Sequence, residues 1–273
     1  MGRESFAGKR RIVVKVGTST LTHANGAANL RRIDRLCRVL SDVSSAGKDV
    51  VLVSSGAVGV GMGKLKISKR PGITAERQAI AAVGQCELMQ IYSKTFAEYG
   101  HIVGQILLTL DVVTREAPRE NVVNTFETLL SMGIIPIVNE NDSVSIEELT
   151  DRQNAGFGDN DTLSVIVASL VRADLLINLS DRDGFYSENP DVNPGAELVK
   201  LVTEITPRIE RAAGGVGSSR GTGGMAAKIE AAKTAMSMGI DMVLANGADP
   251  AVLYGILEGE ETGTYFRPIL KNS

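Results

Sequence analysis

The sequence predicts an α/β protein with a mostly parallel central sheet and helices on both faces, a three-layer sandwich. Three observations predict it. Short runs of Val, Ile and Leu recur along the chain, amphipathic segments separate them, and polar or glycine-rich residues follow the ends of the runs. Continuous apolar runs are typical of strands that are buried on both faces, and their alternation with helices favours parallel pairing.

In the first half of the chain, residues 11–16 (RIVVKV) read as a buried strand that turns at 17–19. Helical spacing then places Leu30, Ile33, Cys37, Leu40 and Val43 on one face. Residues 49–53 form the second strand, followed by polar 54–57. A long helix is expected over about 76–99, and a third strand over 102–108.

In the second half, a helix is expected around 122–130 and a strand over 134–138 that stops at Asn139. A helix over 161–170 and a strand over 175–179 follow. The last pair is a helix with Met225, Ile229, Ala232 and Met236 on one face, then a strand over 242–245.

The composition narrows the functional class. The net charge of −3 gives no electrostatic reason to expect nucleic acid, and aromatic residues make up only 4% with no Trp. His23 and His101 lie near no metal-type cluster, and Cys37 and Cys86 read as small core residues. The charged N-terminus does not resemble a signal peptide, and no apolar run reaches membrane-spanning length, so we expect a cytoplasmic protein without a membrane partner.

The glycine-rich segment 221–228 (GTGGMAAK) opens the helix that follows it. A helix N-terminus presents free N–H groups and partial positive charge, and Lys228 adds a cation where the helix dipole disfavours one. A bound anion such as phosphate would explain that placement. A flexible loop with a solvated lysine is the alternative.

Polar residues follow the ends of several other predicted strands. Lys15 precedes Gly17-Thr18-Ser19, a combination that could cradle phosphate, although a lysine at a strand end could simply reach solvent. Residues 139–142 (NEND) and 158–161 (GDND) could be a turn and a helix cap. Because ligands bind at the carboxyl ends of such sheets, we expect these segments and Ser180-Asp181 to share a site.

Together these segments resemble the amino acid kinase family, over about residues 12–266. The resemblance rests on VKVGTS (14–19), SSGA (54–57), NEND (139–142), GDND (158–161) and TGGM (222–225) in this order. The NEND segment is similar to that of the members that phosphorylate glutamate. Ser180 stands where many members have Thr, which keeps the hydroxyl.

The resemblance implies that MgATP phosphorylates the side-chain carboxylate of L-glutamate, with L-proline as a feedback inhibitor and a homo-oligomer, a dimer or tetramer, as the assembly. It implies one domain over 1–273, with residues about 11–170 binding glutamate and about 171–267 binding ATP. As a departure from many bacterial members, we expect no C-terminal RNA-modification-type domain. The implied catalytic residues are Lys15, Gly17, Asp161 and Lys228. Those for glutamate are Ser55, Asn139, Asp142 and Asn160. Those for ATP are Lys15, Ser180, Asp181, Thr222, Gly223, Gly224, Met225, Ala226, Ala227 and Lys228.

Three other functions remain open at this point. The same fold could phosphorylate another amino acid or carbamate. A non-catalytic sensor of nucleotide or amino acid would not need both Lys15 and Lys228. A dinucleotide-binding oxidoreductase is suggested by the glycines of 56–61, but the G-x-G-x-x-G pattern and its acidic residue are missing.

Overall fold

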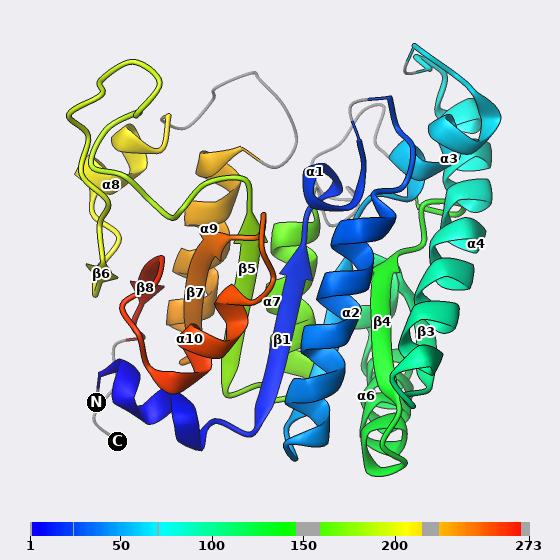
Figure 1. Ribbon diagram of the computed structural model, residues 1–273, viewed down its shortest axis with the longest axis horizontal. Helices are drawn as coiled ribbons and strands as arrows, with labels where there is room; N and C mark the ends of the chain where they lie inside the picture. Colours follow the sequence, from blue (N-terminus) through cyan, green and yellow to red (C-terminus); the bar gives the residue numbers. More distant parts are fainter. Residues whose placement is uncertain (1, 24, 70, 146–158, 215–223, 269–273) are drawn as a thin grey trace.

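The computed structural model describes residues 2–23, 25–69, 71–145, 159–214 and 224–268. Within these ranges eight strands form one sheet in the order β3-β4-β2-β1-β5-β7-β8-β6 (Figure 1). Every neighbouring pair is parallel except β7 and β8, which are antiparallel. The predicted mostly parallel α/β sheet is therefore confirmed.

The strands are β1 (Arg11–Val16), β2 (Asp49–Ser54), β3 (Val103–Leu108), β4 (Ile135–Glu140), β5 (Leu175–Ser180), β6 (Leu201–Val202), β7 (Asp241–Asn246) and β8 (Thr264–Phe266). The helices are the 3-10 helix η1 (Arg3–Gly8), α1 (Thr18–Leu21), α2 (Leu30–Ser45), α3 (Ala57–Leu65), α4 (Thr74–Glu98), α5 (Leu110–Thr114), α6 (Glu116–Ser131), α7 (Asn160–Leu170), α8 (Pro207–Ala212), α9 (Met225–Ser237) and α10 (Val252–Glu258).

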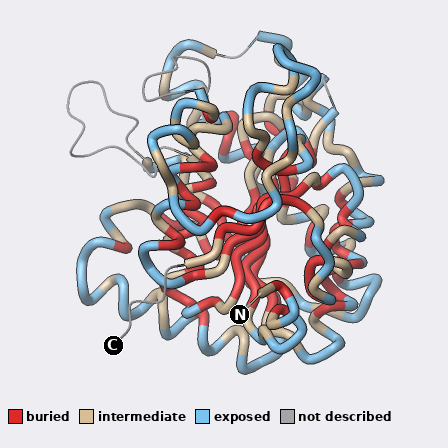
Figure 2. The backbone as a smooth tube through the Cα atoms, turned by 90° about the vertical axis from the view of Figure 1, so that its left-hand side faces the viewer, coloured by how far each residue is buried: buried red, intermediate tan, exposed pale blue. Residues whose placement is uncertain are grey.

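Alternate residues of each central strand enter different cores, which makes the three layers. Val14 and Val16 of β1 pack with α2, α4 and α10 on one face, whereas Val13 packs with α6, α7 and α9 on the other. Figure 2 shows the resulting band of buried strands between two helical layers. This period of two explains why the strands read as unbroken apolar runs in the sequence.

Glycines bring α3 and α4 into close contact. A Cβ on Gly84 would lie 1.8 Å from the carbonyl oxygen of Ala57, and one on Gly61 would lie 2.1 Å from that of Ile80. Gly56 has a φ of 100°, which glycine adopts without steric cost. The glycines of 56–61 thus serve a tight turn and helix packing, which removes the sequence reason for a dinucleotide-binding loop.

Successive strands are added to opposite sides of β1 in the two halves of the chain, so the connections switch direction between β1 and β5. The chain adds β2, β3 and β4 on one side of β1 and then crosses to place β5 on the other side. Loops at the carboxyl ends diverge at such a switch point and leave a crevice between them. The carboxyl ends of β1 and β5 carry Gly17 and Ser180, so the topology positions the predicted site there.

Two expectations need correction. The strand expected to stop at Asn139 continues through Glu140, because both residues pair with β3, in register with Leu107 and Leu108. Cys37 is buried as expected, but Cys86 is exposed, since α4 turns another stripe of residues toward the core.

Candidate active site

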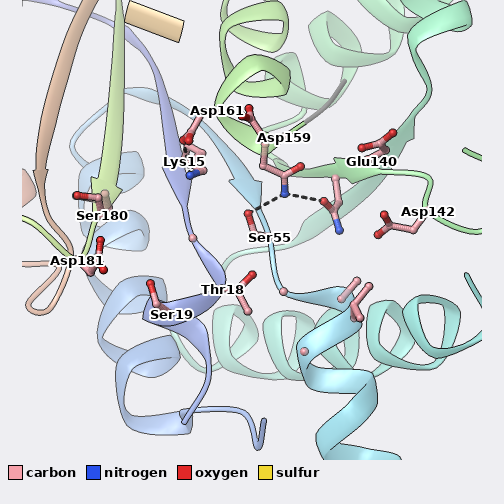
Figure 3. Close-up of a pocket in the computed structure, with 18 of the residues that line it drawn as sticks. Lys15, Thr18, Ser19, Ser55, Glu140, Asp142, Asp159, Asp161, Ser180 and Asp181 are labelled. Atoms are coloured by element: carbon pink, nitrogen blue, oxygen red, sulfur yellow. Dashed lines mark hydrogen bonds and ion pairs between the residues drawn. The ribbon is translucent and has the colours of Figure 1, made fainter. Parts of the chain in front are cut away.

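A cavity of about 480 Å³ opens at the carboxyl ends of β1, β2, β4 and β5 (Figure 3). It brings together most of the residues that the sequence analysis had singled out, although they come from six separate segments. Those that line it are Lys15, Gly17, Ser55, Asn139, Asp142, Asn160, Asp161, Ser180, Asp181 and Lys228.

Two buried lysines share one buried carboxylate in this cavity. The Nζ of Lys15 lies 2.5 Å from Oδ1 of Asp161, and the Nζ of Lys228 lies 3.1 Å from its Oδ2. The exposed fractions are 5% for Lys15, 7% for Lys228 and 1% for Asp161. Two ammonium groups converge on one carboxylate in this cluster, an arrangement that favours an anionic ligand beside them, although Asp159 and Asp181 also line the cavity.

Strand register and a helix start build this cluster. Lys15 on β1 is in register with Asn178 on β5, and the two side chains lie on the α7 side of the sheet. Asp159 caps α7 by accepting a hydrogen bond from the N–H of Thr162 at 2.8 Å, so Asp161 falls in the first turn. Asn178 donates to Oδ1 of Asp161 at 2.7 Å and helps to hold the carboxylate.

The cluster shifts the pKa values of Lys15 and Asp161. Burial lowers the pKa of Lys15 below its ordinary value, although the charge of Asp161 opposes that effect. Burial alone would raise the pKa of Asp161, but Lys15, Lys228 and the hydrogen bond from Asn178 outweigh it and hold the pKa below its ordinary value. Asp161 is therefore ionised at neutral pH and able to fix both ammonium groups.

A chain of side-chain amides lines the neighbouring wall. The Nδ2 of Asn160 donates to Oγ of Ser55 at 2.7 Å and to Oδ1 of Asn139 at 3.0 Å. The Nδ2 of Asn139 in turn donates to Oε1 of Gln85 on α4 at 2.9 Å. These neutral groups are well suited to orient a polar ligand without adding charge.

Two acidic side chains, Glu140 and Asp142, border the far end of the cavity, on the opposite side from Ser180 and Asp181 (Figure 3). Oε1 of Glu140 accepts a hydrogen bond from the hydroxyl of Ser145 at 2.5 Å. Half-buried carboxylates at one end and two lysines nearer the centre favour a ligand with a cationic group at one end and an anionic group at the other.

A second cavity of about 350 Å³ adjoins the first, and Asp181 and Lys228 line both. Gly224, the residue before α9, and Met225 in its first turn also line it. Ala226 and Ala227 are half-buried in that turn, whereas Thr222, Gly223 and the Gly158 of GDND lie outside the described residues. The hydroxyl of Ser180 bonds within the turn, donating to the carbonyl of Arg182 and accepting from its N–H.

Gly17, the first residue after β1, borders open space beside Lys15. A Cβ on this residue would meet Oγ of Ser19 at 3.9 Å and Nζ of Lys15 at 4.0 Å, which are ordinary contacts. Its φ of −85° is open to any residue. The fold itself therefore does not require glycine here, but a ligand close to the backbone would.

Sequence reasoning missed Asn178 and Gln85. A signal existed for Asn178, since it is an amide inside an otherwise apolar strand. Gln85 offered only a polar residue in a helix, and its contact with Asn139 joins positions 54 residues apart. Thr18 and Ser19, which the sequence analysis grouped with Lys15 as a possible phosphate cradle, also line the cavity, as does Asp159 of the helix cap.

The described residues hold no group of three or more His, Cys, Asp or Glu side chains that could bind a metal ion. Over the same part of the chain, no helix combines the length and apolar character needed to cross a bilayer.

Comparison with known proteins assigns the chain to a family. The sequence pattern of the amino acid kinase family matches residues 10–246, and the chain belongs to this family. Two solved structures under 25% identical share its fold. Isopentenyl phosphate kinase from T. acidophilum has a TM-score of 0.64 at 18% identity, covering 94% of this chain and 100% of that one. UMP kinase from Bacillus anthracis has a TM-score of 0.64 at 18% identity, covering 95% and 96%.

Within the family, the chain is much more similar in sequence to two glutamate 5-kinases than to the two solved structures. The chain is 59% identical to glutamate 5-kinase from Clostridium perfringens over 264 residues, 97% of both chains. It is 55% identical to glutamate 5-kinase from Listeria innocua, covering 97% of this chain and 95% of the relative. The resemblance inferred from the sequence motifs is thereby confirmed.

Proposed function

We propose that this chain is a glutamate 5-kinase, which transfers the γ-phosphoryl group of ATP to the side-chain carboxylate of L-glutamate. The products are L-glutamyl 5-phosphate and ADP, and the reaction is the first step toward proline. The observation that carries the proposal is the 59% identity with a curated glutamate 5-kinase over 97% of both chains. The cavity supports it, because one end is acidic and the centre is cationic.

Glutamate lies with its ammonium group toward Asp142 and its side-chain carboxylate toward Lys15 in this proposal. Asp142 near a carboxylate substrate would be repulsive unless it meets the ammonium. Ser55, Asn139 and Asn160 lie between the two ends and orient the backbone of the substrate. Residues 11–170 thereby supply the glutamate end, apart from the shared lysine cluster.

ATP occupies the second cavity in this proposal, with its phosphates directed at the junction formed by Asp181 and Lys228. The N–H groups in the first turn of α9 are unpaired within the helix and favour anions. Residues 171–267 thus supply the nucleotide end. The substrate is MgATP, and the magnesium ion travels with the phosphates and offsets part of their charge, while Asp161 stays with the two lysines.

The transfer needs charge stabilisation rather than a general base. A glutamate side chain has a pKa of about 4.3, so it is already a nucleophilic carboxylate at neutral pH. The difficulty is bringing it to a polyanion. Lys15 binds the transferring group from one side and Lys228 from the other, Asp161 fixes both, and the N–H of Gly17 points at its equatorial oxygens.

The direct test is an ATP-dependent assay in which hydroxylamine traps the acyl phosphate as a hydroxamate. L-glutamate should give hydroxamate in proportion to ADP, whereas aspartate, acetylglutamate and carbamate should give rates at least about 100-fold lower, because an acceptor that leaves buried polar groups unpaired is strongly rejected. Equal rates with acetylglutamate would exclude the assignment, since that acceptor has no ammonium group for Asp142.

We also propose that L-proline inhibits the enzyme in competition with L-glutamate, because proline carries the same α-ammonium and α-carboxylate groups. Initial rates at fixed ATP, with proline titrated at several glutamate concentrations, test this. Inhibition that is independent of glutamate, or none at millimolar proline, would contradict it. The expected homo-oligomer remains a prediction, which sedimentation of the purified protein would check.

A further inference from the structure

We propose that Gln85 on α4 is a positioning residue for glutamate, because it supplies the acceptor that holds Asn139 in the orientation that the Asn139–Asn160–Ser55 chain requires. The inference rests on the proposed function and deepens it. Gln85 does not line the cavity, so it acts through Asn139 rather than on the substrate.

The direction of the chain is set by one backbone carbonyl. The Nδ2 of Asn160 lies 3.4 Å from the carbonyl oxygen of Ser54, and a carbonyl oxygen can only accept. The amide nitrogen of Asn160 must therefore face this side. Its two hydrogens are directed mainly at Oγ of Ser55 and Oδ1 of Asn139, with one of them shared with the more distant carbonyl of Ser54, so both of the nearer oxygens act as acceptors.

The orientation of the Asn160 amide also determines that of Asn139, which contacts α4. Because Asn139 presents Oδ1 to Asn160, it must present Nδ2 on its other side, where it meets Oε1 of Gln85 at 2.9 Å. Asn139 is only 3% exposed, so its donor needs a protein acceptor. Gln85 supplies that acceptor and prevents Asn139 from turning over.

The chain leaves two complementary groups for the substrate. The oxygen of Ser55 accepts from Asn160, which leaves the hydroxyl hydrogen of Ser55 to be donated to the cavity. Asn160 has committed its nitrogen, which leaves Oδ1 as the atom of its amide outside the chain. A donor beside an acceptor suits the α-carboxylate and α-ammonium groups of an amino acid. Turning Asn139 over would put its Nδ2 against that of Asn160 and disrupt both.

Substitutions of Gln85 separate this role from simple electrostatics. Gln85→Glu keeps an acceptor opposite Asn139, whereas Gln85→Lys offers only donors. Glutamate carries a net negative charge, so charge alone would make Gln85→Lys the better binder of glutamate. If Asn139 needs an acceptor at position 85, the order of affinities is reversed, and the glutamate KM of Gln85→Lys should be about tenfold above that of Gln85→Glu.

Gln90 provides the matched control, because it lies on the same helix and is exposed. Gln90→Glu and Gln90→Lys should leave the glutamate KM within about twofold of wild type, as surface substitutions usually do. The KM for ATP should be unchanged in all four variants, and thermal melting identifies any variant that fails to fold. Gln85→Met, which has neither a strong donor nor a strong acceptor, gives a third reading and should also raise the glutamate KM about tenfold.

The hydroxamate assay with wild-type protein comes first, so that the two proposals fail separately. Wild-type protein without glutamate-dependent product would overturn the proposed function. An active wild type in which Gln85→Lys binds glutamate as well as Gln85→Glu, or in which Gln85→Met keeps a normal glutamate KM, would overturn the role of Gln85 alone. A raised glutamate KM in Gln85→Lys and Gln85→Met, with a near-normal value in Gln85→Glu, is the result that we expect.

Discussion

The two walls of the cavity use opposite physical means. One wall is a charged cluster, in which Lys15 and Lys228 converge on Asp161 with all three side chains buried. The other is the neutral amide chain from Ser55 to Gln85. The buried ammonium groups stabilise negative charge that develops close to them in the transition state, whereas hydrogen bonds form only when donor and acceptor point toward each other. The difference indicates that the first wall governs turnover and the second governs recognition of the acceptor.

The largest effect should come from breaking the charged wall. Lys228→Ala or Lys15→Ala should lower kcat by about 1000-fold, because each lysine strengthens its contact as charge develops on the transferring group. Asp161 keeps one lysine in either variant, so the fold should survive. Steady-state kinetics with a melting curve for each variant provide the check, and near-normal kcat in either would refute the two-lysine mechanism.

A single methyl group at Gly17 should separate turnover from stability. Gly17→Ala should lower kcat by about 100-fold, comparable to losing one oxyanion-type donor, because the methyl group fills space that the phosphoryl group needs. Its contacts within the protein are ordinary, at 3.9 Å and beyond, so the melting temperature should change little. A loss of activity accompanied by unfolding would show that Gly17 has a structural role instead.

Substitutions in the amide wall and at its acidic border, Asp142, should change the KM for glutamate rather than kcat. Asp142→Ala should raise the glutamate KM about tenfold and leave the ATP KM unchanged, because its contact with the ammonium is similar in the ground and transition states. Asp142→Asn, which keeps the shape without the charge, should behave likewise. Parallel weakening of ATP and glutamate would place Asp142 elsewhere in the mechanism.

The pH dependence of kcat/KM should reveal the lowered pKa of Lys15. Because burial lowers the pKa of Lys15 from 10.5, kcat/KM for MgATP should begin to fall at a pH below 10.5. Asp161 has a pKa below its ordinary value of 3.8, so it contributes stability above pH 3.8 that is lost as the pH falls through the lower folded value. A kcat/KM for MgATP that stays constant up to pH 10.5 would contradict the shift of Lys15.

The smallest effect is expected at Asn178. Its Oδ1 is buried without a hydrogen-bond partner in the described structure, while its Nδ2 bonds to Asp161. Asn178→Leu removes that unsatisfied group but also the hydrogen bond to Asp161, and because the two effects oppose each other the free energy of unfolding should change by less than about 1 kcal/mol. Since two lysines still hold Asp161, kcat should stay within about threefold. Denaturant titration with kinetics would decide, and a 100-fold loss would give Asn178 a larger role.

The sequence identified site residues where a functional residue also stands out in its local sequence pattern. Lys15 stands out because an apolar strand seldom carries a cation, and the motif around Asp161 also caps a helix. Asn139 and Glu140 were read as a turn because two polar residues usually end a strand. Their pairing with β3 depends on a strand about 30 residues away, which no local pattern contains.

Long-range pairings account for the remaining differences. Gln85 on α4 meets Asn139 on β4, and the glycines that let α4 pack closely against α3 are likewise far from Asn139 in the sequence. Cys86, one position further along α4, was expected in the core by helical spacing. The helix instead buries the stripe that includes Ile80, Gly84 and Leu88. A helix with apolar residues on several faces does not specify by itself which face the sheet will cover.

The most direct test of the division between the two walls is calorimetric titration of Lys228→Ala with L-glutamate. L-glutamate should bind within about threefold of wild type, because the ammonium and backbone contacts of the substrate belong to Asp142 and the amide wall, while kcat of the same protein should fall about 1000-fold. Loss of glutamate binding in proportion to kcat would contradict it, since Lys228 would then hold the acceptor as well as the phosphoryl group.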